Sequence, residues 1–227
     1  MADIVTTLDK IEHCFNHIHL KYFYDKGPVF NHLYGDTYSM FLYFISREMY
    51  FRGEENGATK VFLLNKMMFG VDLFYTVVMP DIFYLSHPSG TVLGNAKYSD
   101  YLVVYQGVSV GSDLGEKGEG GMYPNFGEGT VLLANSTIIG NCNIGDNVTF
   151  GANSLLRNST IESNKIVVNQ WPNHRILPNT RKNSDHYFGK WLFSRFFIIC
   201  ICITSVELSE NTPDLWTIDQ RQSIYND

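Results

Sequence analysis

Few side chains in this sequence are suited to acid–base, nucleophilic or metal chemistry. His87 is the only histidine between residues 70 and 170, and a neutral imidazole can accept a proton near pH 7, as a general base does. On periodicity alone, a corner residue that bonds to nearby backbone is the favoured interpretation of His87. No serine or cysteine stands in a recognisable nucleophile elbow, which disfavours a covalent relay. His13, His17 and His19 include a pair at helical metal-ligand spacing, but we interpret them as solvated or packed side chains and expect no metal site.

Composition excludes several classes of partner and compartment. The formal net charge is −6 and the pI is about 5.6, so the basic footprint of a nucleic-acid-binding protein is missing. The first residues, MADIVTTLDK, include acids and lack the apolar core of a signal peptide, so we expect a cytoplasmic protein. The cysteines have neither zinc nor disulfide spacing, and we expect reduced thiols at Cys14, Cys142, Cys200 and Cys202.

A six-residue repeat predicts the elements that must position these residues. Large apolar side chains occupy one phase: Phe126, Leu132, Ile138, Ile144, Phe150 and Leu156. Smaller ones follow four residues later: Thr130, Ser136, Cys142, Val148, Ser154 and Thr160. Between them stand residues that tolerate positive φ: Gly129, Asn135, Asn141, Asn147 and Asn153. A corner every six residues is typical of a parallel β-helix, in which each coil buries its apolar side chains on the next.

The same period continues upstream and is interrupted once. Val92, Tyr98, Val104 and Val110 keep the six-residue step, with Ala96, Leu102 and Val108 on the small phase. The separation of Val110 and Phe126 is ten residues longer than one step. We therefore predict an extruded loop near 112–125, and a loop that interrupts a regular scaffold is usually functional.

The flanking segments predict three parts of the chain. Apolar spacing indicates helices at 4–19, 38–51 and 59–69, with Asp36 as the N-cap of the second. We assign 1–70 to an N-terminal helical region, 71–178 to the β-helix and 179–227 to a C-terminal extension. The apolar run 187–203 contains Arg195 and is too short to span a bilayer. Packing on this subunit or a neighbour is favoured over contact with a membrane surface.

Four motifs follow one another between residues 70 and 125. They are Gly70-Val71-Asp72, His87-Pro88-Ser89-Gly90 through Gly94, Gln106-Gly107-Val108-Ser109-Val110-Gly111, and a loop that ends at Tyr123-Pro124 before the regular hexapeptides. This order, including the spacing of Asp72 and His87, resembles the serine acetyltransferases within the left-handed β-helix acyltransferase family. The resemblance covers roughly residues 70–176. It implies a left-handed parallel β-helix and an acetyl-CoA-dependent O-acetyltransferase.

The resemblance also implies roles for individual residues. His87 would take the proton of the attacking hydroxyl group, and Asp72 would hold the other ring nitrogen. In this family acetyl-CoA lies along the coils between adjacent subunits, so a homotrimer with sites between subunits is expected. The cofactor positions that match are Gly111, Ala134, Gly151 and Ala152, with Arg175 of the Trp171–Arg175 turn pairing with a CoA phosphate. Alternatively, the small residues only permit tight corners and Arg175 is a solvated charge.

Two departures from the family affect the acceptor. Ser86 stands where the serine enzymes have an aspartate, and Met122-Tyr123 stands where they have a loop Arg-His pair. Losing an arginine-to-carboxylate contact should cost about 2–5 kcal/mol of recognition. We therefore expect a neutral hydroxyl acceptor, such as a sugar or polysaccharide intermediate, with Ser86 and Tyr123 as acceptor-binding residues. The alternatives are serine O-acetylation in cysteine biosynthesis and a non-catalytic trimeric β-helix that serves as an interaction partner.

Overall fold

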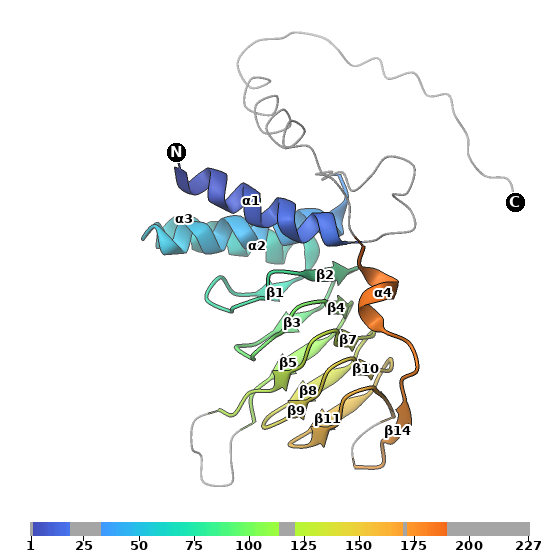
Figure 1. Ribbon diagram of the computed structural model, residues 1–227. Coiled ribbons are helices and arrows are strands. Elements are labelled where there is room, and N and C mark those ends of the chain that lie inside the picture. The colour runs from blue at the N-terminus through green and yellow to red at the C-terminus, as the bar shows by residue number, and fades with distance from the viewer. Residues whose placement is uncertain (1, 19–32, 114–120, 170–171, 190–227) are drawn as a thin grey trace, which may run out of the picture. The chain divides into compact units, whose positions relative to one another are not determined.

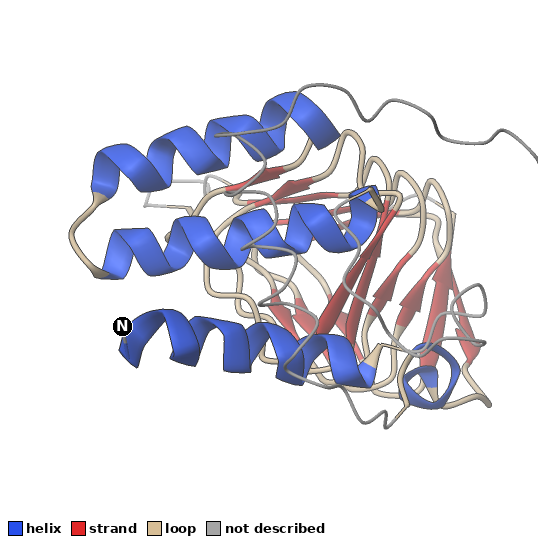
Figure 2. Cartoon of the chain, turned by 90° about the horizontal axis from the view of Figure 1, so that it is seen from above, coloured by secondary structure: helices blue, strands red, loops and turns tan. Residues whose placement is uncertain are grey.

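The computed structural model describes residues 2–18, 33–113, 121–169 and 172–189, all within one compact unit, Met1–Phe193. Its first elements are three helices: α1 Ala2–His17, α2 Gly35–Phe51 and α3 Glu55–Phe69 (Figure 1). The three predicted helices are present, and each begins two to four residues earlier than expected. Seen from above, α2 lies between α1 and α3 (Figure 2).

The strands after the helices form three sheets. The β1 sheet contains β1 Asp72–Leu73, β3 Val92–Leu93, β5 Ser109–Gly111, β8 Thr137–Ile139 and β11 Leu155–Arg157. The β2 sheet contains β2 Phe83–Ser86, β4 Leu102–Tyr105, β7 Val131–Leu132, β10 Thr149–Phe150, β13 Lys165–Val168 and β14 Arg175–Pro178. The β6 sheet contains β6 Asn125–Phe126, β9 Asn143–Ile144 and β12 Thr160–Ile161.

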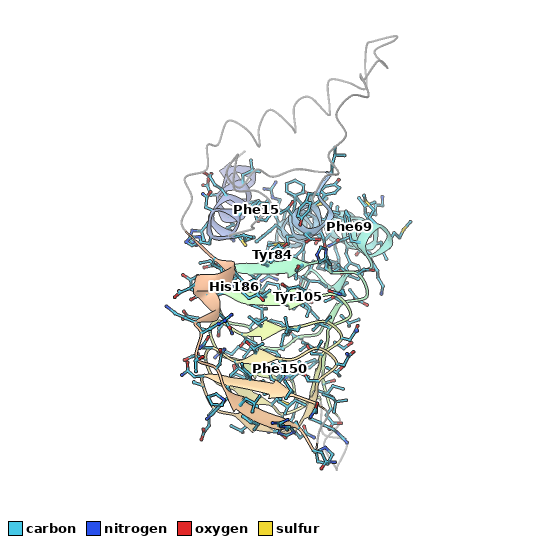
Figure 3. The ribbon with its side chains drawn as sticks, turned by 90° about the vertical axis from the view of Figure 1, so that its right-hand side faces the viewer. Phe15, Phe69, Tyr84, Tyr105, Phe150 and His186 are labelled. Atoms are coloured by element: carbon cyan, nitrogen blue, oxygen red, sulfur yellow. The ribbon has the colours of Figure 1, made fainter. Side chains whose placement is uncertain are left out.

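Strands of the same sheet come from successive coils. They pair in parallel throughout, except that β14 is antiparallel to β13. The fold-class prediction is confirmed: a left-handed parallel β-helix of about 5 turns follows N-terminal helices. Each coil contributes inward side chains to a continuous core, and every large residue of the predicted repeat from Phe126 to Leu156 is at most 4% exposed. Figure 3 shows Tyr84 and Tyr105 on neighbouring strands under the helices, with Phe150 in a later coil.

Three details of the repeat prediction are wrong, because the coils differ in length. Gly140 (φ +81), not Asn141, takes the positive φ at its corner. In the first coils Leu93 points inward at 2% exposure, whereas Val92 is 43% exposed. In the last coil Thr160 is exposed. The six-residue step of the large apolar residues therefore holds from Phe126 to Leu156, whereas single positions slip by one residue at Val92, at the Gly140 corner and at Thr160.

The helices cover the first coil of the β-helix. The Cys14 thiol of α1 donates a hydrogen bond to the Phe83 carbonyl oxygen of β2 at 3.3 Å. Asp36 is not the N-cap of α2, a position that Tyr34 occupies. Its carboxylate is instead buried at 6% exposure and accepts a hydrogen bond from the Tyr84 hydroxyl at 2.9 Å. The helices thus shield a coil edge that would otherwise be unpaired.

The C-terminal described segment returns along the coils toward α1. After β14, the Asn183 side chain at the start of α4 (Asn183–Tyr187) donates to the Gly129 carbonyl oxygen at 2.7 Å. The Phe188 ring then lies 5.3 Å from the Tyr101 ring, and the Gly189 amide donates to the His17 carbonyl oxygen at 2.7 Å. Most of the apolar run predicted at 187–203 lies outside the described residues. In the part of the chain described above, no helix has the length and apolarity needed to cross a membrane.

Candidate active site

His87 lies where the chain passes from the β2 sheet to the β1 sheet. The same corner recurs in each later coil, and we call this stack of corners the His87 corner. Its stacked residues with positive φ are Gly90 in the coil of His87 and, in the later coils, Gly107, Asn135, Asn153 and Asn169. Glycine and asparagine adopt this conformation at low cost. His87 itself has a φ of +48°, a region that histidine enters more readily than most side chains.

The strand register shows why His87 projects from this corner. Ser86 pairs with Tyr105 and Val92 pairs with Ser109. Ser86 and Val92 are therefore six residues apart in the coil of His87, whereas their partners Tyr105 and Ser109 are only four residues apart in the next coil. The two additional residues lengthen the turn, and the His87 side chain is exposed. His87 therefore stands in the longer segment of its coil, and Gly90 takes the position that stacks on Gly107 of the next coil.

Asp72 lies in the preceding coil next to this corner. Its amide donates to the Thr91 carbonyl oxygen at 2.8 Å, and the Gly90 amide donates to the Gly70 carbonyl oxygen at 3.0 Å. The Asp72 carboxylate, however, accepts a hydrogen bond from the Lys66 ammonium group of α3 at 2.7 Å. Among the described residues, no hydrogen bond joins Asp72 to His87. The structure thus brings both predicted dyad residues to one corner, with Lys66 as the present partner of the carboxylate.

The two predicted acceptor residues do not meet within one chain. Ser86 precedes His87 and is 6% exposed. Tyr123 stands at the return of the extruded loop, and a Cβ atom added to Gly94 would lie 3.2 Å from its ring. Gly94 follows β3, whereas His87 precedes it, so the two residues lie at opposite ends of this strand.

Most of the predicted cofactor residues follow the His87 corner through the later coils. Ala134, Gly151 and Ala152 lie beside its asparagines, and the Asn153 amide donates to the Ala134 carbonyl oxygen at 2.9 Å. Arg175 is exposed and pairs across the strands with Val168, which precedes the corner residue of the last coil. The exception is Gly111. It is the last residue of β5 and therefore lies at the end of the β1-sheet strands that is far from the His87 corner.

An open depression elsewhere on the coils has the wrong charge for a phosphate-bearing cofactor. It is lined by Pro80, Asp81, Tyr98, Ser99, Asp100, Glu128 and Asp146. Four carboxylates would repel the phosphates of CoA. In the described ranges, no group of three or more histidine, cysteine, aspartate or glutamate side chains is arranged to hold a metal ion. None of the predicted cofactor residues lines this depression.

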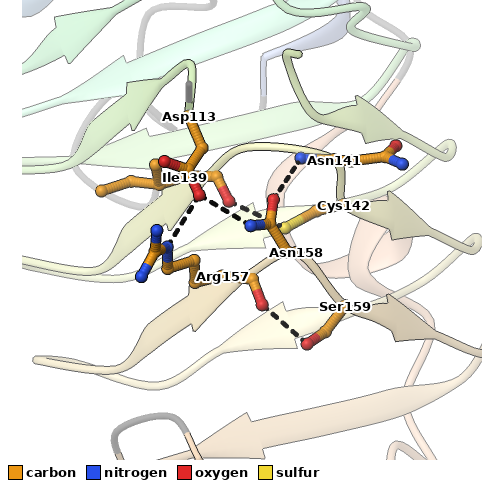
Figure 4. A network of polar contacts seen from close by, with 7 residues as sticks. All are labelled: Asp113, Ile139, Asn141, Cys142, Arg157, Asn158 and Ser159. Atoms are coloured by element: carbon orange, nitrogen blue, oxygen red, sulfur yellow. Dashed lines mark hydrogen bonds and ion pairs between the residues drawn. The ribbon is translucent and has the colours of Figure 1, made fainter. Parts of the chain in front are cut away.

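Two features of the site were missed from the sequence. Lys66 stands one helical turn before Gly70, and its proximity to Asp72 could have been read from that short spacing. The second is a polar network around Asp113 at the root of the loop (Figure 4). Its partners, Arg157 and Asn158, lie about 45 residues later in the chain, and no local pattern links them to the loop.

Comparisons with known proteins agree with this geometry. The repeat family described as bacterial transferase hexapeptide (six repeats) matches residues 124–165. A serine acetyltransferase of Staphylococcus xylosus is 26% identical over 157 residues, which cover 67% of this chain and 71% of that protein.

Solved structures resemble the chain over most of its length. A Neisseria gonorrhoeae serine acetyltransferase has a TM-score of 0.61 at 23% identity, with 80% of this chain and 72% of that one covered. A serine acetyltransferase in complex with CoA has a TM-score of 0.52 at 20% identity and covers 62% of this chain and 56% of its own. At these identities the structural likeness establishes a shared fold.

Proposed function

Because this chain is a serine acetyltransferase-like hexapeptide acyltransferase, we propose that it transfers an acetyl group from acetyl-CoA to the hydroxyl group of a small acceptor, with His87 as the general base. The observation that carries the proposal is the lengthened corner that exposes His87 in the coil before the corners of Gly107, Asn135 and Asn153. An exposed imidazole at this end of the corner would meet a thioester whose pantetheine chain follows the later coils.

The reaction needs one proton to move twice. As the acceptor oxygen attacks the thioester carbonyl carbon, the imidazole of His87 takes the hydroxyl proton. The tetrahedral intermediate then collapses, the carbon–sulfur bond breaks, and the imidazolium returns the proton to the CoA sulfur. The products are the acetyl ester and free CoA. No covalent intermediate on the protein is required.

Asp72 is proposed to orient the His87 ring once the site is loaded. A carboxylate on the second ring nitrogen would fix the tautomer and stabilise the imidazolium. The present partner of Asp72 is Lys66, and their side chains are 35% and 48% exposed. An exposed ion pair of this kind contributes about 0–1 kcal/mol. Asp72 can therefore exchange Lys66 for His87 at low cost.

The cofactor is proposed to run along the His87 corner. Ala134, Gly151 and Ala152 leave room for a pantetheine chain, and Arg175 at the far end offers a guanidinium to a phosphate. Gly111 and Tyr123 would then come from a second copy, because they lie at the other end of the β1 sheet. This arrangement supports the expected homotrimer with sites between subunits.

For the acceptor, the relatives favour L-serine over the sugar or polysaccharide intermediate expected from the sequence departures. Lys66 supports serine as the acceptor. Its ammonium group lies beside Asp72, and once Asp72 has turned to His87, this ammonium group would be available to the carboxylate of serine. A neutral hydroxyl remains the second candidate, because Ser86 and Met122-Tyr123 bring no charge to the acceptor side. Lys66→Met should raise the KM for serine at least about tenfold and leave that of a neutral acceptor unchanged.

The deciding experiment is an acceptor panel. The purified chain is incubated with acetyl-CoA and L-serine, or one of several sugars, and free CoA and the acetyl ester are quantified by chromatography. We expect serine to raise CoA release above the rate of acetyl-CoA hydrolysis. A sugar that outperforms serine would establish the neutral-acceptor alternative. If no acceptor is acetylated and calorimetry detects no acetyl-CoA binding, the enzyme proposal fails and the non-catalytic interaction protein is favoured.

A further inference from the structure

The first root of the extruded loop is bonded to coils far along the chain. The Asp113 Oδ2 atom accepts hydrogen bonds from Arg157 Nε at 2.8 Å and from Asn158 Nδ2 at 2.6 Å (Figure 4). The Asp113 side chain is 15% exposed, compared with 50% for Arg157. The carboxylate is thus the more enclosed member of the pair, and its direction is set by two donors from the coil that contains β11.

The corner beneath Asp113 is shaped to receive it. Gly140 has a φ of +81°, and a Cβ atom there would lie 2.7 Å from the Asp113 Cβ and would also meet the Asn158 side chain. Asn158 has a dual role, since its Oδ1 atom accepts a hydrogen bond from the Asn141 amide at 2.8 Å. The glycine allows the close approach, and the asparagine joins the loop root to two successive coils.

The second root of the loop is fixed to the first by backbone. Asp113 and Met122 form an isolated antiparallel bridge, and each amide donates to the carbonyl oxygen of the other at 3.2 Å. Tyr123 follows and packs on Gly94, with a ring atom 3.2 Å from the position of an added Cβ. Met122 and Tyr123 are therefore held from one side by Asp113 and from the other by the end of β3.

We infer that Asp113 is a positioning residue that sets the place of Met122 and Tyr123, and through them the fit of the acceptor. This inference rests on the proposed function, in which these two residues reach the acceptor side of the site. Asp113 itself touches neither substrate nor His87. Its effect passes from the carboxylate through its own backbone to the paired backbone of Met122. A residue with a purely structural role would change the stability of the chain without changing recognition of the acceptor.

The test compares Asp113→Ala, Arg157→Ala and the double variant with the wild type. Because Asp113→Ala removes two hydrogen bonds to a charged group, the KM for the acceptor should rise about tenfold or more. The KM for acetyl-CoA and the pH dependence of kcat should stay within about twofold of wild type, because His87 is not contacted. The double variant should be no worse than Asp113→Ala alone, since both substitutions break the same interaction.

Two further variants separate the loss of this contact from a general effect of removing a surface charge and from a failure to fold. Glu162→Ala removes an exposed ion pair with Lys165 (3.5 Å) that does not touch the loop, and it should leave every readout unchanged. Asp113→Asn keeps an acceptor oxygen for both donors but loses the charge, so it should fold if Asp113→Ala does not and show an intermediate rise in KM.

Amide hydrogen exchange provides a readout that needs no turnover. The Met122 amide, which donates to the Asp113 carbonyl oxygen, should exchange faster in Asp113→Ala and Arg157→Ala and at the wild-type rate in Glu162→Ala. Unchanged exchange in Asp113→Ala would overturn the positioning role. Faster exchange with an unchanged acceptor KM would overturn the link to recognition. If the wild type acetylates no acceptor, the proposed function fails, and the exchange result alone decides whether Asp113 holds the loop return.

Discussion

Replacing His87 by asparagine separates chemistry from folding at this corner. Asparagine is suited to this backbone, since Asn135 and Asn153 turn corners of later coils at φ values of +59° and +58°, and His87 has a φ of +48°. His87→Asn therefore keeps a residue suited to the backbone and removes the proton acceptor. Loss of a general base typically lowers the rate by about 10²–10⁴-fold.

The structure also bounds the effect on stability. The His87 side chain is exposed, so little packing is lost on substitution. Left-handed backbone costs most residues about 1–2 kcal/mol, a penalty that asparagine and glycine largely avoid. The free energy of unfolding of His87→Asn should therefore stay within about 1 kcal/mol of wild type. His87→Gly should do the same, because relief of backbone strain offsets the added freedom of its unfolded chain.

The assay is steady-state CoA release at saturating acetyl-CoA, with urea unfolding of the same samples as the control for folding. An asparagine variant that kept more than about a tenth of the wild-type rate would refute the assignment of His87 as base. Asp72→Asn should fall between the wild type and His87→Asn, because the base remains while its orienting partner is weakened. Wild-type activity in Asp72→Asn would show that Asp72 serves only Lys66.

Three predictions concern the scaffold. Phe150→Ala should lower the free energy of unfolding by about 3–5 kcal/mol in urea titrations, because Phe150 is fully buried. The control Met67→Ala, at an 83% exposed position, should change the free energy of unfolding by no more than about 0.5 kcal/mol. Gly140→Ala should lower the free energy of unfolding more than Gly53→Ala, since both glycines have φ near +80° but, of the two, only Gly140 is crowded by neighbouring atoms. Equal losses of stability would mean that backbone conformation alone matters. Burial raises the pKa of the Cys14 thiol from 9.0 to about 12. The unfolded thiol thus loses its proton first, stability falls as pH rises through this window, and Cys14→Ala should flatten that decline.

Much of the β-helix was predictable because its rule is local. Leu132 and Phe150 point inward and Asn135 and Asn147 turn corners, each as its place in the six-residue step requires. The prediction failed where coil length changed, as at Val92. A single inserted or missing residue turns the side chains of that strand to the other face, and only the register of paired strands reveals where the six-residue step resumes.

The candidate site was predictable in its residues and not in its contacts. The resemblance to the serine acetyltransferases, which includes the spacing of Asp72 and His87, pointed to both, and the structure brings them to one corner. The short spacing of Lys66 and Asp72 indicates that they are neighbours, but it does not determine that their side chains are bonded. Asp72 bonds to Lys66 across a helix-to-strand junction, and that geometry depends on how α3 packs against β1.

The sequence by itself determined the coils and most of their inward side chains, because hexapeptide spacing acts between near neighbours, and the resemblance to the serine acetyltransferases pointed to His87. The tertiary structure alone decided that two additional residues push His87 out of its corner, and that Asp113 fixes the loop return through residues about 45 positions later. Such contacts join segments whose meeting depends on the stacking of every coil between them. No local pattern of side chains records that stacking.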